Sequence, residues 1–291
     1  MTRGIDHLVL AVRDLDRARA AYKRLGFTMT PKAQHPFGTQ NALVQLDTCF
    51  LEVLSVADPA LFPAAEPKAF SFPKFNAHFL ERREGMSMLV LDSEDAAADR
   101  SDFAEAGLQT YLPFEFGRDA EQPDATTARV GFKLAFTTDP NAPDAAYFTC
   151  EQLAPELFWK PDYQTHANTA TTVREAMMIS ATPEAHWKFF EGFAGTDDVK
   201  ETDTGLLVET GRGAIRIERP DGVAESWGTA VPVADYPSPR FAGTVIGVTD
   251  LDAAKACLEA GGIKHFDIEE RLVVPSDETC GVAFAFEAKG D

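Results

Sequence analysis

A supersecondary unit returns along this chain, and the repeat constrains the fold more than any other feature of the sequence. The run Asp14-Leu15-Asp16 reappears 236 positions later as Asp250-Leu251-Asp252. The same interval carries Gly26-Phe27 onto Gly262-Ile263, so the first and last copies align without gaps. Two further copies fit intervals of about 81 and about 168 positions. Self-similarity on this scale predicts one structural module repeated four times.

Each copy has the pattern of a strand, a helix and three further strands. In the first copy, residues 5–12 form a β-type run, and residues 17–25 place apolar side chains at helical spacing. Asp14 suits the N-cap of that helix, and Gly26 suits the left-handed turn that ends it. Strand-like runs follow at 41–46 and 50–56, and the other copies begin at 86–91, 173–181 and 245–248. The sequence therefore predicts a βαβββ module.

One such module leaves a face of its curved sheet exposed, and pairing two modules buries that face. We expect an α+β fold in which four βαβββ modules pair into two barrel domains. Modules 1 and 2 would form residues 1–160, and the more diverged modules 3 and 4 would form residues 161–291. The junction falls in the polar stretch 160–172. The proline-rich residues 57–74 and the acidic, polar residues 117–127 are expected to be loops.

The charge of the chain excludes two classes of partner. Its 291 residues contain 27 Lys and Arg against 46 Asp and Glu, for a net charge of −19. Nucleic acids and anionic membranes need a basic surplus instead. No apolar run is long enough for a membrane helix, and the N-terminal residues lack the pattern of a signal peptide. The four cysteines form no CxxC motif, so reduced thiols in a cytoplasmic protein are expected.

Several motifs carry a resemblance to a known superfamily. These are Ile5-Asp6-His7-Leu8-Val9-Leu10-Ala11-Val12, Leu25-Gly26-Phe27 and Phe50-Leu51-Glu52-Val53. They resemble the first module of the vicinal oxygen chelate superfamily, which includes glyoxalase I, extradiol dioxygenases and bleomycin-resistance proteins. The run His35-Pro36-Phe37-Gly38-Thr39-Gln40-Asn41 is similar to its glyoxalase-like branch. The resemblance implies two glyoxalase-like barrel domains, and it transfers fold better than function.

The resemblance also implies a metal site in the first domain. Metal-bearing members take one ligand from the first strand and one from the last strand of each module, and His7 and Glu52 match these positions. The second module offers Met88, a poor ligand, and then Cys150 or Glu151. A divalent ion such as Zn, Fe, Mn or Ni would suit His7, Glu52 and Glu151, or no cofactor is bound at all. As a buried carboxylate beside an imidazole, Glu52 could equally be a general base, with His7 as its catalytic partner.

Three further residues are candidates for binding the substrate. Asn41 could fix a substrate carbonyl, and His35 lies in the same stretch, although a turn at Gly38-Thr39 explains that stretch as well. Trp159 could form a pocket wall or cap the domain junction. Cys150 is better explained by packing than as a nucleophile, and His186 and His265 are expected at the surface.

The second domain aligns carboxylates where the first has its candidate site. Glu175 takes the position of His7, and the fourth module has Gly243 there. The final strands add Glu218 and Glu287. Three carboxylates without a histidine do not form the two-His, one-Glu site of an extradiol dioxygenase. We therefore expect the chemistry in the first domain, with Glu52→Ala abolishing activity and Glu287→Ala leaving it intact.

Two functions remain open at this stage. One is a glyoxalase-like enzyme, a lyase, an isomerase or a catalyst of proton abstraction next to a carbonyl, acting on a small oxygen-rich metabolite. The other is a non-catalytic protein of the bleomycin-resistance type that sequesters a small molecule. No phosphate loop, GxSxG elbow, HExxH or dinucleotide fingerprint is present, so ATP- and NAD-dependent chemistry has no support. The expected partner is a small molecule, and a homodimer is left open.

Overall fold

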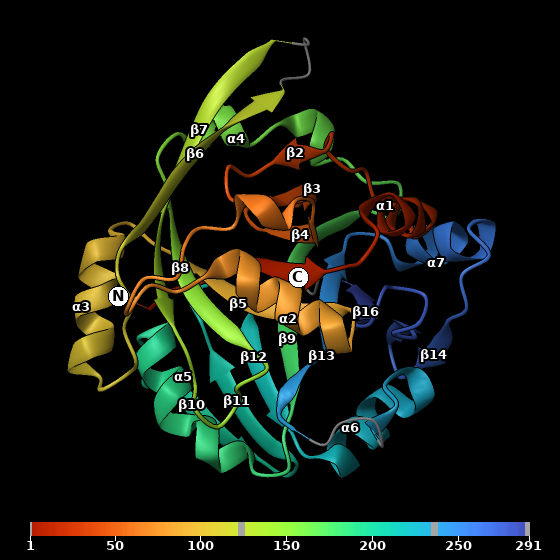
Figure 1. Ribbon diagram of the computed structural model, residues 1–291. Helices are drawn as coiled ribbons and strands as arrows, with labels where there is room; N and C mark the ends of the chain where they lie inside the picture. Colours follow the sequence, from red (N-terminus) through yellow and green to blue (C-terminus); the bar gives the residue numbers. More distant parts are fainter. Residues whose placement is uncertain (1, 122–125, 234–237, 289–291) are drawn as a thin grey trace.

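Two eight-stranded sheets carry the fold in the computed structural model, which describes residues 2–121, 126–233 and 238–288 (Figure 1). The first sheet has the order β2-β3-β4-β1-β5-β8-β7-β6. Its strands are β1 (Ile5–Ala11), β2 (Ala33–Gln34), β3 (Thr39–Gln45), β4 (Phe50–Val56), β5 (Gly85–Asp92), β6 (Phe114–Glu121), β7 (Thr127–Thr137) and β8 (Ala146–Gln152).

The second sheet repeats this topology as β10-β11-β12-β9-β13-β16-β15-β14. Its strands are β9 (Ala170–Ile179), β10 (Val199–Thr202), β11 (Gly205–Glu209), β12 (Ala214–Glu218), β13 (Arg240–Val248), β14 (Phe266–Ile268), β15 (Arg271–Val274) and β16 (Ala283–Ala288). In each sheet the first strands of two modules pair antiparallel at the centre, β1 with β5 and β9 with β13. The expected α+β fold of paired glyoxalase-like modules is confirmed.

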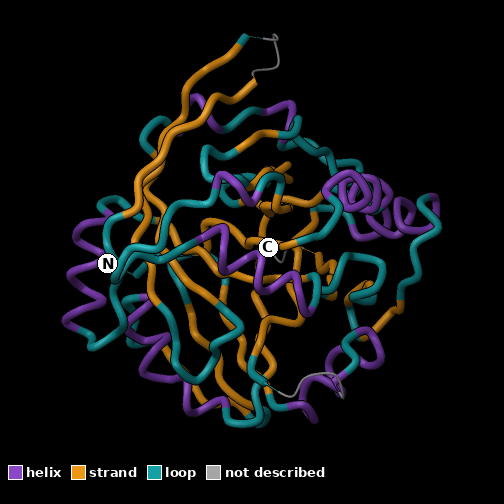
Figure 2. The backbone as a smooth tube through the Cα atoms, in the orientation of Figure 1, coloured by secondary structure: helices purple, strands orange, loops and turns teal. Residues whose placement is uncertain are grey.

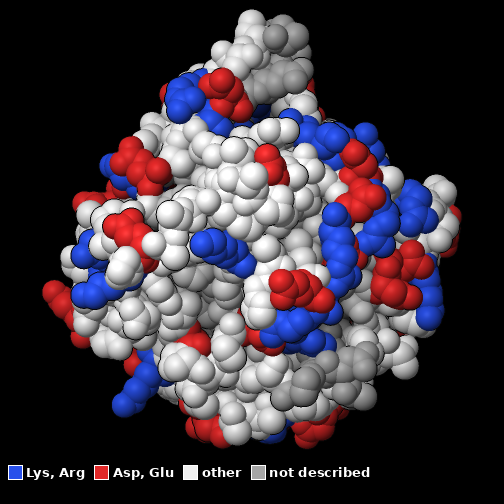
Figure 3. Space-filling model, viewed as in Figure 1, with Lys and Arg blue, Asp and Glu red and all other residues white. Residues whose placement is uncertain are grey.

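Most helices lie around the outside of the strands, and the helix of residues 72–82 crosses in front of them in this view (Figure 2). The helices are α1 (Leu15–Arg24), α2 (Phe72–Arg82), α3 (Ala96–Glu105), α4 (Pro155–Phe158), α5 (Trp187–Ala194), α6 (Pro220–Trp227) and α7 (Leu251–Ala260), with 3₁₀ helices at Pro59–Leu61, Pro161–Tyr163, Pro183–His186 and Gly228–Ala230. Among the described residues, no helix is long and apolar enough to span a membrane. On the face shown in Figure 3, basic and acidic side chains are interspersed among uncharged areas.

The repeated helix signals perform the same task in modules 1 and 4. The Asp14 carboxylate accepts a hydrogen bond from the backbone N–H of Arg17 at 3.0 Å, and the Asp250 carboxylate accepts one from Ala253 at 2.9 Å. These N-caps satisfy backbone donors that have no partner within the helix. Gly26, after α1, has φ of +91°, a conformation that costs side-chain-bearing residues free energy. The sequence repeat therefore corresponds to repeated residues that begin and end the helix of each of these modules.

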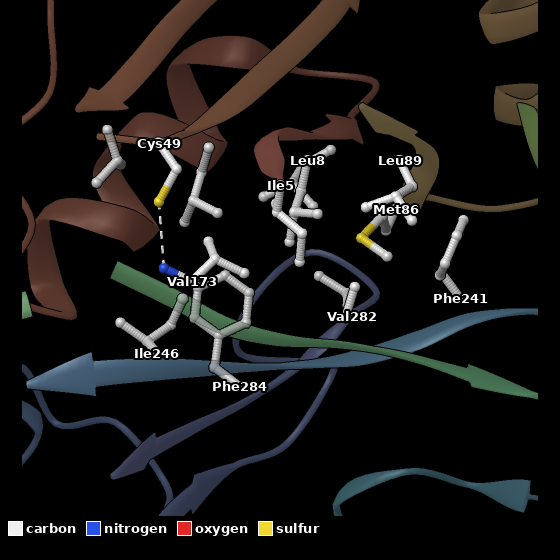
Figure 4. Packing of buried hydrophobic residues seen from close by; sticks show 14 of the residues in the cluster. Ile5, Leu8, Cys49, Met86, Leu89, Val173, Phe241, Ile246, Val282 and Phe284 are labelled. Carbon is white, nitrogen blue, oxygen red and sulfur yellow. Dashed lines mark hydrogen bonds between the residues drawn. The ribbon is translucent and has the colours of Figure 1, made fainter. Parts of the chain in front are cut away.

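The two sheets pack against each other through their outer faces, and each keeps a separate core on its inner, concave face. Figure 4 shows the shared core, where Ile5 and Leu8 of the first sheet face Ile246 and Phe284 of the second. There the Cys49 thiol accepts a hydrogen bond from the backbone N–H of Val173 at 3.2 Å. Aromatic side chains dominate the inner core of the first sheet. The concave face of the first sheet thus lies on the side away from the shared core.

The expectation of a loop at 117–127 is wrong for most of that segment. Strand β6 continues to residue 121, and β7 begins at residue 127, while residues 122–125 lie outside the described residues. The two strands form an antiparallel hairpin that projects beyond the body of the molecule (Figure 1). Alternation along β6 places Phe114, Phe116 and Arg118 on one side of the strand. The polar residues belong to the projecting end of the hairpin. Their composition is typical of a loop, although the strand has an apolar inner side.

The expected loop at 57–74 is partly a helix as well. A 3₁₀ turn occupies Pro59–Leu61, and α2 already begins at Phe72. Pro73 falls in the first turn of α2, where a missing N–H removes no intrahelical hydrogen bond. Phe72 is buried in the inner core of the first sheet. The prolines of this segment therefore start a helix and do not only interrupt structure.

Candidate functional site

The concave face of the first sheet encloses a small cavity, here called the inner cavity. It has a volume of about 40 Å³, which is room for two or three water molecules. Seven phenylalanines line it, together with His7, His35, Asn41, Leu43, Glu52, Arg118, Leu134 and Cys150; the phenylalanines are Phe37, Phe50, Phe72, Phe116, Phe132, Phe148 and Phe158. Five ionisable side chains in an otherwise apolar cavity require partners or a ligand.

Glu52 is the central carboxylate of the inner cavity. It projects from β4, and only 6% of its surface is exposed. Its Oε1 accepts a hydrogen bond from the Asn41 amide at 2.6 Å. Its Oε2 lies 3.8 Å from Nε2 of His7, and its Oε1 lies 3.7 Å from Nε2 of His35. One oxygen is therefore held by a donor, and the other faces an imidazole without a hydrogen bond of normal length.

Asn41 connects Glu52 to His35. Its Nδ2 donates to Glu52 and also lies 3.3 Å from Nε2 of His35, whose Nδ1 is 2.8 Å from the Thr39 hydroxyl. Both protons of the amide are therefore committed. Its Oδ1 is buried and has no hydrogen-bond partner among the described residues. An amide oxygen accepts hydrogen bonds, so this end of Asn41 can accept one from a donor on a ligand.

His35 stays neutral over the physiological range. Burial, reinforced by the positive charge of Arg118, lowers its pKa to about 3. Its ring stacks on Phe37 with centroids 5.0 Å apart. A neutral imidazole with Nδ1 at a hydroxyl and Nε2 at an amide donor is a fixed wall of the cavity that carries no charge.

His7 is held by a residue that the sequence analysis missed. Its Nδ1 lies 2.5 Å from Oδ1 of Asp6, and Oδ2 of Asp6 accepts from the Gln152 amide at 3.0 Å. The ring stacks on Phe50 at a centroid distance of 4.2 Å. These contacts fix the ring and turn Nε2 toward Glu52. Consecutive strand residues normally face opposite sides, but the pairing of β1 with β5 shifts register between Ile5 and His7, at Asp6.

Arg118 is the second residue that was missed, because it lies in the segment expected to be a loop. It comes from β6, and only 7% of its surface is exposed. Its guanidinium lies 6.0 Å from the centre of the Phe132 ring. Burial lowers the pKa of Arg118, and the negative charge of Glu52 acts in the opposite direction. A strand pattern on one side of β6, Phe114-x-Phe116-x-Arg118, was the signal that could have found it.

A larger depression, here called the outer groove, adjoins the inner cavity. It has a volume of about 610 Å³ and shares His35, Leu43, Arg118 and Phe158 with the inner cavity. Its charged lining consists of Lys32, Arg118, Asp119, Arg129 and Lys160. Lys32 is paired with Asp16 at 3.0 Å and Arg129 with Asp119 at 3.3 Å, so Arg118 and Lys160 are the cations of this lining that have no carboxylate partner among the described residues.

The structure brings together four of the six residues assigned to the site from the sequence. His7, His35, Asn41 and Glu52 all line the inner cavity, and their chemical roles remain predictions. Glu151 does not line it: its carboxylate pairs with Lys133 at 3.1 Å and accepts from the backbone N–H of Ala96. Side chains alternate along β8, so Cys150 faces the cavity and Glu151 faces away.

Trp159 is the sixth of these residues, and Cys150 was assigned to packing from the sequence. Trp159 does not line the cavity, but its ring packs on Phe50 and Phe158, which do. Cys150 is buried, and burial together with nearby carboxylates, Asp6 first, raises the pKa of its thiol well above the usual value. A protonated thiol is a weak nucleophile and a weak ligand, which favours packing for Cys150.

The residues present do not complete the metal site that the fold family implies. His7 and Glu52 supply two donors, and Oε1 of Glu52 is already taken by Asn41. The position matching His7 in the second module is Met88, buried in the apolar inner core. Among the described residues, no three His, Cys, Asp or Glu side chains are grouped so that they could hold a metal ion. Arg118 adds a fixed positive charge to the same cavity.

Trp227 fills part of the concave face of the second sheet. Trp227 of α6 is 1% exposed, and a Cβ at Gly243 would lie 2.9 Å from its ring. Glycine at the position matching His7 is thus explained by the close approach of Trp227. The aligned carboxylates are engaged in the same way: Glu175 accepts from Arg216 at 2.8 Å, and Glu287 pairs with Arg174 and Arg271.

Comparisons with known proteins support the fold. Similar solved structures are a hypothetical protein from Staphylococcus aureus (TM-score 0.70, 13% identity, covering 99% of this chain and 100% of that one) and a 4-hydroxymandelate synthase mutant from Streptomyces coelicolor (0.61, 12%, 100% and 94%). A third is the Mn(II)-bound glyoxalase from Novosphingobium aromaticivorans (0.56, 10%, 99% and 83%). None of the curated proteins compared with the chain matches it.

The family assignment comes from the sequence. The model of the glyoxalase-like domain matches residues 5–192, which include both modules of the first sheet and the start of the second. This range contains every residue that lines the inner cavity. Because the match covers more than half of the chain, the protein belongs to the family of the glyoxalase-like domain.

Proposed function

We propose that the protein is an enzyme that removes a proton next to a carbonyl in a small, oxygen-rich metabolite, with Glu52 as the base. The observation that supports this is the unequal use of the two Glu52 oxygens. Oε1 accepts from Asn41, whereas Oε2 points at His7 and has no hydrogen bond of normal length. A carboxylate that is oriented at one oxygen and free at the other can take a proton from a bound substrate.

His7 gives the abstracted proton a second position. With Nδ1–H donated to the Asp6 carboxylate, Nε2 of a neutral His7 is an acceptor that faces Oε2 of Glu52. The separation of 3.8 Å exceeds a hydrogen bond, so transfer of the proton from Glu52 to His7 requires the two side chains to approach when substrate binds. Asp6 would stabilise the imidazolium that forms. An isomerase returns the proton to a neighbouring atom, and a lyase expels a group instead.

Exchange of substrate hydrogen with solvent tests the proposal. Short 2-hydroxy ketones and 2-oxo acids are incubated with the protein in D₂O, and deuterium uptake next to the carbonyl is followed by NMR. Glu52→Gln keeps the shape of the side chain and removes the base, so uptake should fall by about 10²- to 10⁴-fold. Glu287→Gln, in the second domain, should match the unchanged protein. Equal uptake by the protein and by Glu52→Gln would refute the proposal.

A second candidate, sequestration of a small molecule without turnover, is favoured by the seven phenylalanines of the inner cavity. An apolar wall binds ligands without needing a reactive group. The same variants separate the two functions. A sequestering protein binds its ligand equally well after Glu52→Gln and exchanges no hydrogen in either form.

A further inference from the structure

Arg118 is a buried cation whose surroundings are incomplete. It is more than nine-tenths buried, and its Nε has no hydrogen-bond partner among the described residues. Among the described residues, no carboxylate lies within the ion-pairing distance of 4.0 Å from its guanidinium. The guanidinium contacts the ring of Phe132, and the charge of Glu52 acts on it from farther away. A buried guanidinium costs free energy unless charged or polar acceptors surround it. The position therefore calls for an acceptor that comes from outside the chain.

The place of Arg118 indicates the direction from which that acceptor arrives. Arg118 lines both the inner cavity and the outer groove. Lys32, Arg129 and Lys160 line the outer groove beside it. A cationic depression in an acidic molecule concentrates anions at its mouth. An anion that enters through the outer groove meets Arg118 before it reaches Glu52.

We propose that Arg118 binds the carboxylate of a small monocarboxylic acid, whose apolar end occupies the inner cavity. This inference rests on the proposed function, since it names the substrate class of the same site. The planar guanidinium matches a carboxylate in a two-pronged geometry. The carboxylates of Asp6 and Glu52 repel a second negative charge, so a monoanion is preferred to a phosphate dianion. The phenylalanine side chains pack against the apolar carbons of a ligand and provide no hydrogen-bond donor for an anion.

The size of the cavity sets the length of the acid. A volume of about 40 Å³ admits a chain of a few carbons and excludes a long one unless side chains move. Each methylene that enters the apolar wall should raise affinity by about fourfold. With the carboxylate of a 2-oxo acid on Arg118, the rest of the acid extends into the inner cavity toward Glu52, and C3, next to the keto group, is the carbon that would lose its proton.

Binding of simple acids and their neutral amides tests this inference. Acetate, butyrate, hexanoate and butyramide are titrated into the full chain by isothermal calorimetry. Butyrate should bind more tightly than acetate, hexanoate should gain less than two further methylenes predict, and butyramide should bind at least tenfold more weakly than butyrate. Arg118→Met should lower the affinity for butyrate by about 10- to 100-fold. Equal binding of butyrate and butyramide would overturn the inference.

Two further variants keep the result interpretable. Arg100→Met removes an exposed cation of α3 that lines neither the inner cavity nor the outer groove, so it should change butyrate affinity by no more than about twofold. Arg118→Lys keeps the charge without the planar fork and should bind butyrate between the Met variant and the unchanged protein. If Arg118→Met fails to fold, Arg118→Lys becomes the test. In that variant, loss of the preference for butyrate over butyramide, without a weaker affinity for butyrate, would refute a role for the charge of Arg118.

Glu52→Gln separates this inference from the proposed function. It leaves Arg118 in place and removes a repelling charge, so butyrate should bind at least as well as before. Binding that needs Arg118, together with no hydrogen exchange in any variant, would retain the carboxylate site and refute the base. Hydrogen exchange that needs Glu52, without any preference for acids over amides, would retain Glu52 as the base and refute the carboxylate site at Arg118.

Discussion

Oδ1 of Asp6 lies 2.5 Å from Nδ1 of His7, its neighbour in β1. Two consecutive strand residues meet in this way because the pairing of β1 with β5 shifts register at Asp6. The other oxygen of Asp6 is held by the Gln152 amide, so the carboxylate is fixed from both sides. A carboxylate behind a histidine sets the tautomer and orientation of the ring, whether the ring binds a ligand or moves a proton.

Asp6→Asn should therefore impair turnover more than binding. The amide keeps the shape of the side chain but can present a proton to Nδ1, which favours the tautomer with Nε2–H pointing at Glu52. We expect kcat to fall by about 10- to 100-fold, with KM changed by less than about threefold. Steady-state kinetics on a substrate found by the exchange assay gives both values. A variant with unchanged kcat would show that Asp6 only supports the strand.

Metal content follows from the donor set of the inner cavity. Two donors, His7 and Glu52, should bind Mn²⁺ or Zn²⁺ weakly, so protein dialysed against metal-free buffer should retain well below one equivalent. Glu52→Ala should lower the residual metal further, and Glu287→Ala should not, because Glu287 is paired with two arginines. Elemental analysis of the purified variants measures this. Full metal content in the His7→Ala/Glu52→Ala double variant would place an ion elsewhere in the molecule.

His35 should make the protein sensitive to mild acid. Its pKa is about 3 when folded, and that of an unfolded histidine is about 6.5. Between these values the unfolded chain takes up a proton that the folded chain does not, so stability falls as the pH is lowered from 6.5. The slope contributed by one such group is at most about 1.4 kcal/mol per pH unit.

Urea unfolding at pH 7.5, 6.5, 5.5 and 4.5 measures this slope. His35→Gln should show a smaller loss of unfolding free energy between pH 6.5 and 4.5 than the unchanged protein. His78→Gln is the matched control, since His78 lies on the exposed side of α2, and it should keep the full slope. Identical slopes for both variants would mean that His35 titrates normally.

Much of the fold could be predicted because it depends on local signals that the modules share. The caps at Asp14 and Asp250 and the turn at Gly26 follow from residue chemistry within a few positions. The inward direction of Glu52 follows from strand alternation inside an apolar run. Such signals lie in the sequence whether or not the partner strand is known.

What could not be predicted depends on contacts between distant segments. Arg118 belongs to a strand whose polar end resembled a loop, and its cavity requires β4 and β8 to arrive from elsewhere. His186 was expected at the surface, but it is fully buried: its Nδ1 lies 2.5 Å from Oδ2 of Asp139, and its Nε2 lies 2.9 Å from the Ser180 hydroxyl. Asp139 comes from the other half of the chain, so no local pattern could reveal this contact.

The last prediction concerns the second domain, where Trp227 occupies the space that the inner cavity leaves open in the first. Trp227→Ala should lower the free energy of unfolding by about 3–5 kcal/mol, because it removes a large buried ring. Gly243→Ala should cost about 1–3 kcal/mol in the unchanged protein, since the new methyl group would lie 2.9 Å from that ring. In the Trp227→Ala background the same substitution should cost less, although Met177 also lies 3.0 Å from the new atom. Urea unfolding of the four proteins gives the coupling between the two sites. Additive effects would show that the ring does not explain the glycine, and the position matching His7 would then need another reason for lacking a side chain.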